Sequence, residues 1–147
     1  MLRGRFGNTT GRPYIEGRLL LPRLALRSEI SFCIDTGADR TILLPSDSMR
    51  MNLDFSRLGH KAVAVGIGGA AAMFDEEAVI AFADKLAVYV YRLRIKIAAN
   101  QPSIRDLPSL LGRDVLHRWH MNYHPGRNRL TMRVVTADRI LPLRTPR

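Results

Sequence analysis

The pattern of apolar and polar residues predicts a chain built mainly from short strands. Short runs alternate between apolar and polar residues or are continuously apolar, and clusters of glycine, proline and asparagine separate them as turns. Helix is expected at 45–51 and directly after Gly112. This mixture favours a small closed or sandwich-like β fold. The predicted strands cover residues 15–21, 29–34, 41–44, 62–65, 77–83, 86–97, 119–123 and 129–135.

One predicted strand ends in an acidic residue. The apolar run 32–34 is followed by Asp35, Thr36 and Gly37. Bulky apolar residues favour a strand and glycine ends it, so the Asp35 carboxylate is expected where a buried strand opens into a tight loop. A carboxylate in such a place is costly unless its surroundings compensate it. By itself, the octet 32–39 is as typical of a turn aspartate as of an active-site loop.

Length and composition bound the class of protein. The 147 residues suffice for one domain with a hydrophobic core. No apolar run approaches the length of a membrane helix, and the basic N-terminus lacks the apolar segment of a secretory signal. The single cysteine, Cys33, excludes an internal disulfide and is typical of a reducing compartment. We therefore expect a cytoplasmic protein with no membrane partner.

The ends of the chain differ in composition from its middle. Residues 1–13 combine arginine with several glycines and predict a flexible leader. Residues 136–147 predict an irregular basic tail. The folded domain is expected to occupy residues 14–135.

The formal net charge of +10 comes almost wholly from arginine. Such a balance is found in proteins that bind nucleic acid or other anions. The arginines are spread along the chain, however, and aromatic residues make up 7% of it. Without a nucleic-acid-reading motif, the sequence does not favour a nucleic-acid partner.

Three other chemistries are weakly supported. His117, His120 and His124 resemble a metal-binding cluster, but the alternation around them favours a strand and no cysteine or acid completes the set, so no metal site is expected. Cys33 lacks a histidine partner and is better explained as an apolar wall residue than as a nucleophile. The glycines at 66–69 lack the spacing of a phosphate-binding loop. No cofactor is expected.

Three features occur in one order along the chain. They are Asp-Thr-Gly at 35–37, a glycine-rich hairpin tip at 66–69, and two apolar residues followed by glycine and a short helix at 110–116. Together they resemble the retropepsin family of aspartic proteases, the single-domain relatives of retroviral proteases. The resemblance covers roughly residues 14–134, and the added strand at 129–135 resembles non-viral and bacterial members. It implies a closed acid-protease β-barrel with a flap hairpin and one short C-terminal helix.

The resemblance implies roles for the matching residues. Asp35 is expected to act as catalytic acid and base, and Thr36 to form a hydrogen bond across a dimer axis. Gly37 allows close approach of a backbone. The residues expected to bind substrate are Cys33, Ala38, Asp39, Arg40, Ile42, Val65, Gly66, Ile67, Gly68, Gly69, Pro108 and Leu110.

The resemblance also implies residues that hold the Asp35 loop in place and a second copy of the chain as a partner. Arg113 and Asp114 are expected to hold the loop, Arg113 through an ion pair with Asp39. Peptide hydrolysis by aspartic acids takes two carboxylates that share a proton and hold one water. The chain contains one Asp-Thr-Gly, so the second carboxylate must come from a second copy, and a homodimer is expected. The expected substrate is a peptide or protein cut between apolar residues, and the loose ends leave self-processing open.

A fold by itself does not determine function. The alternative is a catalytically silent module of the same fold that serves dimerisation or peptide binding. The intact Asp-Thr-Gly at 35–37 and the glycine-rich segment at 66–69 favour the aspartic endopeptidase.

Overall fold

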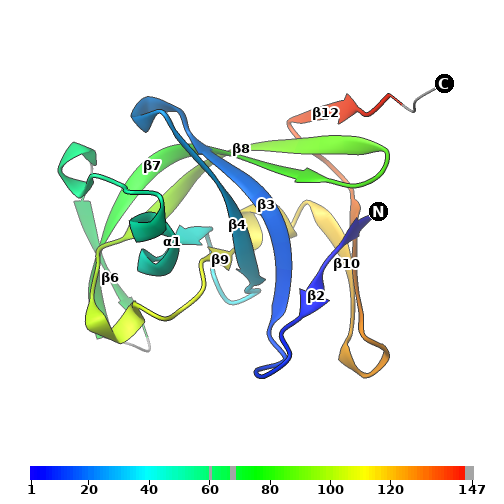
Figure 1. Cartoon of the computed structure of the whole chain (residues 1–147), viewed down its shortest axis with the longest axis horizontal. Coiled ribbons are helices and arrows are strands. Elements are labelled where there is room, and N and C mark those ends of the chain that lie inside the picture. Colours follow the sequence, from blue (N-terminus) through cyan, green and yellow to red (C-terminus); the bar gives the residue numbers. More distant parts are fainter. Residues whose placement is uncertain (60, 67–68, 145–147) are drawn as a thin grey trace.

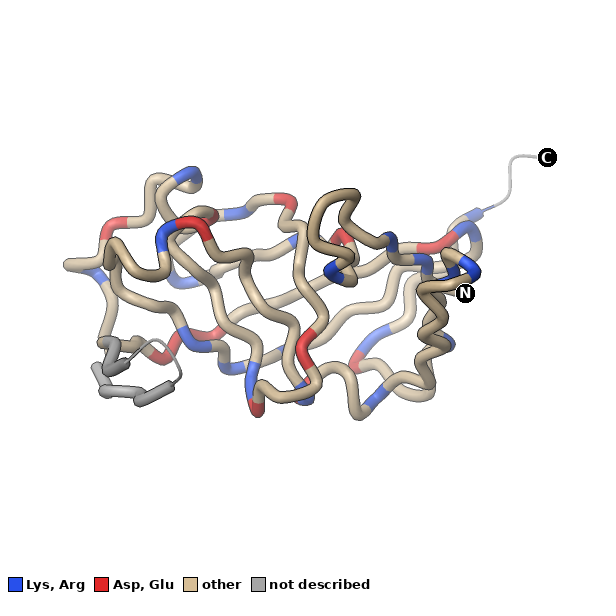
Figure 2. The backbone as a smooth tube through the Cα atoms, turned by 90° about the horizontal axis from the view of Figure 1, so that it is seen from below, with Lys and Arg blue, Asp and Glu red and all other residues tan. Residues whose placement is uncertain are grey.

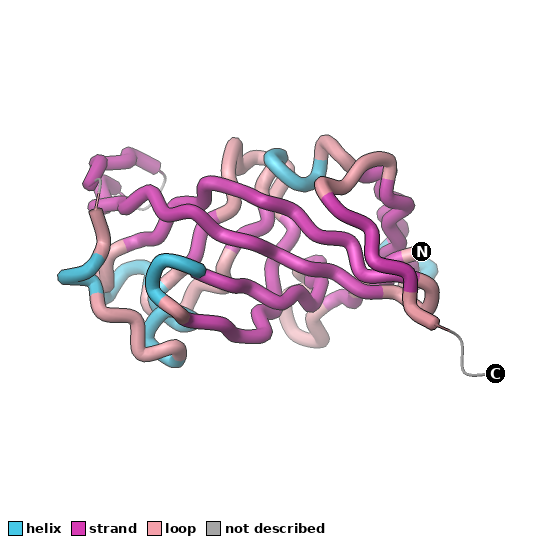
Figure 3. Tube along the Cα trace, turned by 90° about the horizontal axis from the view of Figure 1, so that it is seen from above, coloured by secondary structure: helices cyan, strands magenta, loops and turns pink. Residues whose placement is uncertain are grey.

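Strands make up most of the molecule, and its helices are short and peripheral (Figure 3). The computed structural model describes residues 1–59, 61–66 and 69–144, and for 61–66 and 69–71 it describes the backbone alone. The strands are β1 (Leu2–Arg3), β2 (Arg5–Phe6), β3 (Pro13–Leu21), β4 (Leu26–Ile34), β5 (Ile42–Leu43), β6 (Lys61–Gly66), β7 (Gly69–Ala83), β8 (Ala87–Ala98), β9 (Leu110–Leu111), β10 (Trp119–His124), β11 (Arg129–Val134) and β12 (Arg139–Pro142). The helices are α1 (Pro45–Arg50) and α2 (Arg113–Leu116), with 3-10 turns at Pro22–Leu24, Phe55–Arg57, Pro102–Ile104 and Pro125–Arg127.

Six strands close into a barrel. The main sheet runs in the order β12-β8-β5-β9-β4-β3-β7-β6, with β2 beside β3. Because β7 also pairs with β8, the path β8-β5-β9-β4-β3-β7 closes on itself. Figure 1 shows β6 at one end of the molecule and β10 at the other. The mainly-β fold with a closed barrel, predicted from the sequence, is confirmed.

The barrel interior is filled by alternating apolar side chains. Ile30 and Phe32 of β4 are fully buried, as expected for a strand whose every second residue faces the core. Phe82 packs edge-on against Trp119, with 4.9 Å between ring centroids. The Trp119 Nε1–H donates a 2.7 Å hydrogen bond to the hydroxyl of Tyr91. These contacts attach β10 to the barrel, since burying large aromatic side chains contributes most of the packing energy.

The structure corrects the expectation of a flexible leader over residues 1–13. A separate three-stranded sheet has the order β1-β11-β10, and β1 places Leu2 opposite Met132. The Leu2 side chain is 1% exposed, and the Gly4 N–H donates to the Leu130 carbonyl at 2.8 Å. A two-residue strand has no periodicity that a sequence could reveal, and burial of Leu2 holds it in place.

The described part of the predicted tail, residues 136–144, also contains a strand that was not expected. β12 pairs with β8, so that Ile140 lies opposite Tyr89, while all four side chains of β12 remain exposed. Backbone hydrogen bonding to β8, and not burial of side chains, therefore holds β12 in place. Such a strand shows no alternation of apolar and polar residues in the sequence. Among the described residues, no helix has the length and apolar character needed to cross a membrane.

Candidate active site

The loop that contains Asp35 begins where β4 ends inside the sheet. β4 pairs in parallel with β9, so Cys33 lies opposite Leu110 and Ile34 opposite Leu111. The Asp35 N–H donates to the Leu111 carbonyl at 3.0 Å, one residue beyond the strand. The position of Asp35 is therefore set by two strands from distant parts of the sequence.

The Asp35 carboxylate is half-buried and accepts a hydrogen bond from its own loop. The Gly37 N–H donates to Oδ1 at 2.8 Å, and the Ala38 N–H donates to the Asp35 carbonyl at 3.2 Å. A Cβ atom at position 37 would lie 3.1 Å from the same Oδ1, which is tighter than ordinary contact. Glycine at 37 therefore lets the backbone turn back onto the carboxylate. Among the described residues, no other group donates a hydrogen bond to this carboxylate.

Helix α2 holds the loop from the side. The Arg113 guanidinium donates to the Thr36 carbonyl at 2.7 Å and forms the predicted ion pair with Asp39. The Arg113 N–H donates to the Ala38 carbonyl at 2.9 Å. Asp39 is 84% exposed, so its ion pair contributes little stability, and the two bonds to loop carbonyls matter more for position.

A buried polar cluster lies beneath the loop. The Asp114 carboxylate accepts 2.8 Å hydrogen bonds from both the N–H and the hydroxyl of Thr41, which is 1% exposed. The Gly112 N–H donates to the Thr41 hydroxyl at 3.2 Å. A Cβ at position 112 would come within 2.5 Å of the Arg40 carbonyl carbon, so the two segments cross too closely for any other residue. Asp114 was predicted to support the loop, whereas its partner Thr41 was not foreseen.

A second buried hydroxyl was also missed. Ser109, directly before β9, is fully buried and donates to Asp47 Oδ2 at 2.6 Å. Its Oγ accepts from the Leu44 N–H at 3.0 Å, and its carbonyl accepts from the Cys33 N–H at 2.8 Å. Ser109 thus joins β4, β9 and helix α1. A single serine beside a proline-containing loop carries no sequence signal of this role.

Three predicted pocket residues lie on adjacent strands. Leu110 of β9 pairs with Cys33 of β4 on one side and with Ile42 of β5 on the other. Leu110 and Ile42 are half-buried, as is Pro108 just before them, and Cys33 is 8% exposed. Burial raises the pKa of the Cys33 thiol, which disfavours the thiolate that a nucleophile needs. An apolar wall fits this position better than a reactive cysteine.

Arg40 is occupied by its own chain. Its guanidinium donates to the Arg94 carbonyl at 2.9 Å and forms an ion pair with Asp75 at 3.1 Å. A substrate acid would have to compete with Asp75 for this charge. The substrate-binding role of Arg40 stays a prediction.

The glycine-rich hairpin is present as β6 and β7. Val65 lies opposite Ala70 and Gly66 opposite Gly69, so backbone pairing continues to the edge of the described hairpin. The predicted flap-tip residues Ile67 and Gly68 lie outside the described residues. Figure 1 shows β6 and β4 on opposite sides of helix α1.

The histidines are not gathered into a metal site. His117 is exposed and follows α2, while His120 and His124 lie on β10. Within the described residues, no three His, Cys, Asp or Glu side chains are placed to hold a metal ion.

Comparison with known proteins identifies a solved structure that shares this fold. No protein-family model matches the chain, and no curated protein matches it. The chain is similar to the crystal structure of a retropepsin-like aspartic protease from Rickettsia conorii, with 20% identity, a TM-score of 0.54 and coverage of 86% of this chain and 94% of that chain. EIAV protease in complex with the inhibitor HBY-793 aligns with 21% identity, a TM-score of 0.48 and coverage of 76% and 90%. Together with the closed barrel, the first likeness shows that this chain has a retropepsin-like fold.

Proposed function

We propose that this chain is an aspartic endopeptidase that works as a homodimer and uses Asp35 from each copy. The observation that carries the proposal is the position of Asp35 at the end of β4, in a loop bound by α2 and β9. Its carboxylate receives a bond from Gly37, while the neighbouring acids Asp39 and Asp114 are occupied by Arg113 and Thr41. The likeness to an aspartic protease in solved structure agrees with this assignment.

The chemistry requires a second carboxylate. The chain contains one Asp-Thr-Gly, so a twofold axis beside Thr36 would bring the second Asp35 to the site. The pair shares one proton. The ionised Asp35 takes a proton from a water, whose oxygen attacks the peptide carbonyl carbon, while the protonated Asp35 donates a hydrogen bond to the carbonyl oxygen. Proton transfer to the leaving nitrogen then breaks the C–N bond.

The substrate class follows from the walls near Asp35. Cys33, Ile42 and Leu110 form an apolar group on three adjacent strands, so we propose cleavage between apolar residues. An extended peptide would receive backbone hydrogen bonds from the glycine-rich hairpin, including Gly66 and Gly69. We also propose that the protein works in the cytoplasm, because a chain with a single cysteine is typical of a reducing compartment.

The deciding experiment compares the wild type with Asp35→Asn on an unfolded protein substrate from about pH 4 to 7, the range for a coupled aspartic pair. Fragments are identified by mass spectrometry, and the oligomeric state is measured at the assay concentration. We expect cuts between apolar residues by the wild type, a loss of about a thousandfold or more in Asp35→Asn, and full activity in Asp106→Asn, whose acid lies in an exposed turn. Spectra of the enzyme itself test self-processing, since shortened ends would appear in the wild type alone.

Two results would contradict the proposal. Equal cutting by Asp35→Asn would exclude Asp35 as the catalytic group. No cutting by a wild type shown to be dimeric would favour the catalytically silent dimerisation or peptide-binding module.

A further inference from the structure

The outer face of the three-stranded sheet carries a group of cationic and polar side chains. On β11, Arg129, Thr131 and Arg133 alternate with the buried Leu130 and Met132 and so point away from the core. The register places Arg3 opposite Thr131, Asn122 opposite Thr131 on the other side, and His120 opposite Arg133. We call this set the cationic face: Arg3, His120, Asn122, Arg129, Thr131 and Arg133.

Many arginines in the rest of the molecule, unlike those of the cationic face, have an acidic partner. Figure 2 shows basic positions along the whole chain, many of them beside acidic ones. Seven arginines elsewhere form ion pairs: Arg5–Glu16, Arg18–Glu29, Arg23–Glu76, Arg40–Asp75, Arg50–Asp47, Arg113–Asp39 and Arg118–Asp138. Within the described residues, the side chains of Arg3, Arg129 and Arg133 pair with no carboxylate and donate no hydrogen bond.

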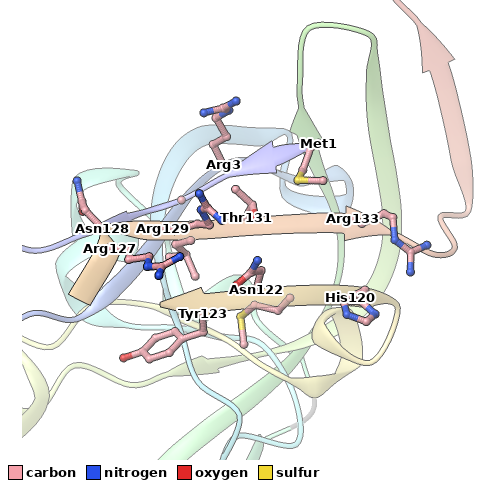
Figure 4. A pocket seen from close by; sticks show the side chains of 13 residues that line it. Met1, Arg3, His120, Asn122, Tyr123, Arg127, Asn128, Arg129, Thr131 and Arg133 are labelled. Atoms are coloured by element: carbon pink, nitrogen blue, oxygen red, sulfur yellow. The ribbon is translucent and has the colours of Figure 1, made fainter. Parts of the chain in front are cut away.

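The groove beside the face has no acidic lining, and Asp84, which lies near Arg3, is already paired with the Met1 ammonium at 2.6 Å. The side chains of the face border this open groove of about 760 Å³, seen closely in Figure 4, and none of the residues that line the groove is Asp or Glu. Arg127, in the turn between β10 and β11, adds a further positive charge at its edge. The sequence from 115 to 137 contains no acidic residue at all. The β1 strand then adds Arg3 to this acid-free region through backbone pairing.

The arrangement favours an extended polyanion over a single anion or a second copy. Arg129 and Arg133 are four residues apart on one strand face, about 13 Å, and Arg3 lies between them along the neighbouring strand. Three charges in a row match several phosphates in succession. A twofold contact through the same face would place arginine against arginine, which is repulsive.

We propose that the cationic face binds single-stranded nucleic acid. The forked guanidinium groups would hold phosphates, because arginine offers paired donors that fit phosphate oxygens. The exposed ring of His120 offers a surface on which an unpaired base stacks, and Asn122 and Thr131 supply hydrogen bonds. A carboxylate-rich peptide would match the charge but would make no use of this ring. This binding is independent of the proposed protease activity.

The sequence did not favour this partner, because its arginines are dispersed along the chain. The structure changes the argument at one place. Arg3 comes from one end of the chain and Arg129 from the other, and the sheet brings them onto one acid-free face.

The test measures binding of fluorescently labelled 20-nucleotide oligo(U) and oligo(dT) by polarisation, over a range of salt concentrations. The variant is the triple change Arg3→Gln, Arg129→Gln and Arg133→Gln. Its matched control carries the same loss of charge at exposed arginines elsewhere: Arg27→Gln, Arg92→Gln and Arg105→Gln. We expect the first triple to weaken binding about 30-fold or more and to reduce the slope of log K against log salt by about two, while the control changes little.

Further measurements keep the test decisive. Replacing the same three arginines by lysine should retain the salt slope, since lysine also neutralises phosphate. Urea unfolding checks that the triple glutamine variant is folded. If that variant is unfolded, the single variant Arg133→Gln replaces it and should lower the slope of log K against log salt by about 0.7. Equal weakening by both triples would overturn the proposal, as would equal affinity for duplex DNA. Displacement by polyglutamate at the same charge concentration as oligo(U) would assign the face to an acidic protein instead.

Discussion

The Asp35 loop and the cationic face handle charged groups in opposite ways. Around the loop, Arg113, Asp114 and Thr41 each find partners within the chain, through bonds to Thr36, Asp39 and the strands beside them. On the cationic face, the arginines of β1 and β11 have no such partner among the described residues. The same type of residue therefore fixes geometry in one region and stays available to an external anion in the other.

The difference also separates stability from binding. A buried hydrogen-bonded network is expensive to break, because removal of one member leaves its partners without bonds in a medium of low polarity. An exposed charge without a partner contributes little to the folded state. Substitutions in the buried network beneath the loop should therefore lower the free energy of unfolding, whereas substitutions on the cationic face should leave it nearly unchanged.

The largest effect is expected from Gly112→Ala. The new methyl group would lie 2.5 Å from the Arg40 carbonyl carbon and 2.7 Å from its oxygen, and backbone atoms cannot move aside easily. We expect a loss of roughly 3 kcal/mol in the free energy of unfolding, measured with urea. Gly59→Ala is the control, since nothing lies within 4 Å of a Cβ there. Equal effects at both positions would show that helix α2 and the loop are not packed as described.

The next effect is expected from Asp114→Ala. It removes the acceptor for the N–H and hydroxyl of Thr41, which is buried away from water. Leaving these donors without a partner should cost about 2 kcal/mol in unfolding free energy. Asp106→Ala, in an exposed turn, should change it by less than about 0.5 kcal/mol. A loss below that value for Asp114→Ala would mean that Thr41 finds another acceptor.

A smaller and pH-dependent effect is expected from Asp138→Asn. Hydrogen bonds from the Arg118 guanidinium and the Arg92 N–H lower the pKa of Asp138. A carboxyl group whose pKa is lower in the folded state adds stability above its unfolded pKa, near 4, and loses that contribution as the pH falls through the folded value. The variant should be less stable by about 1 kcal/mol at pH 7, allowing for solvent screening. This gap should close below pH 4, and a gap independent of pH would contradict the ion pair.

The smallest effect is expected from Arg129→Gln on the cationic face. The side chain is exposed, and its nearest charged neighbours on the face are other arginines. Its removal should change the unfolding free energy by less than about 0.5 kcal/mol, because no internal bond is lost. The test is the urea midpoint, compared with that of Asp114→Ala. A loss near 2 kcal/mol would reveal an internal role and remove the contrast between the two regions.

Local pattern was enough to predict much of the barrel and the position of Asp35. The alternation in β4 and β11 and the glycines after Asp35 and before Arg113 are local signals, and the structure has strands, loop and helix at those places. The ion pair between Arg113 and Asp39 followed from the family resemblance and is present.

The rest depends on contacts between distant segments. Thr41 and Ser109 are polar residues in or beside apolar runs, and only their partners Asp114 and Asp47 explain them. β1 is too short to carry a periodic pattern, and its pairing with β11 depends on the burial of Leu2. The cationic face could not be foreseen for the same reason, since that pairing brings Arg3 to it.

The parallel pairing of β4 with β9 also sets an order in time. Asp35 leaves the ribosome about 75 residues before the segment that supports it, because Cys33 and Asp35 bond to Ser109 and Leu111. At about 5–20 residues per second, that interval lasts roughly 4–15 s. Throughout it the loop has neither β9 nor α2 to hold it. The loop is therefore supported only after most of the chain has been synthesised, and a nascent chain that ends before α2 cannot contain a finished loop.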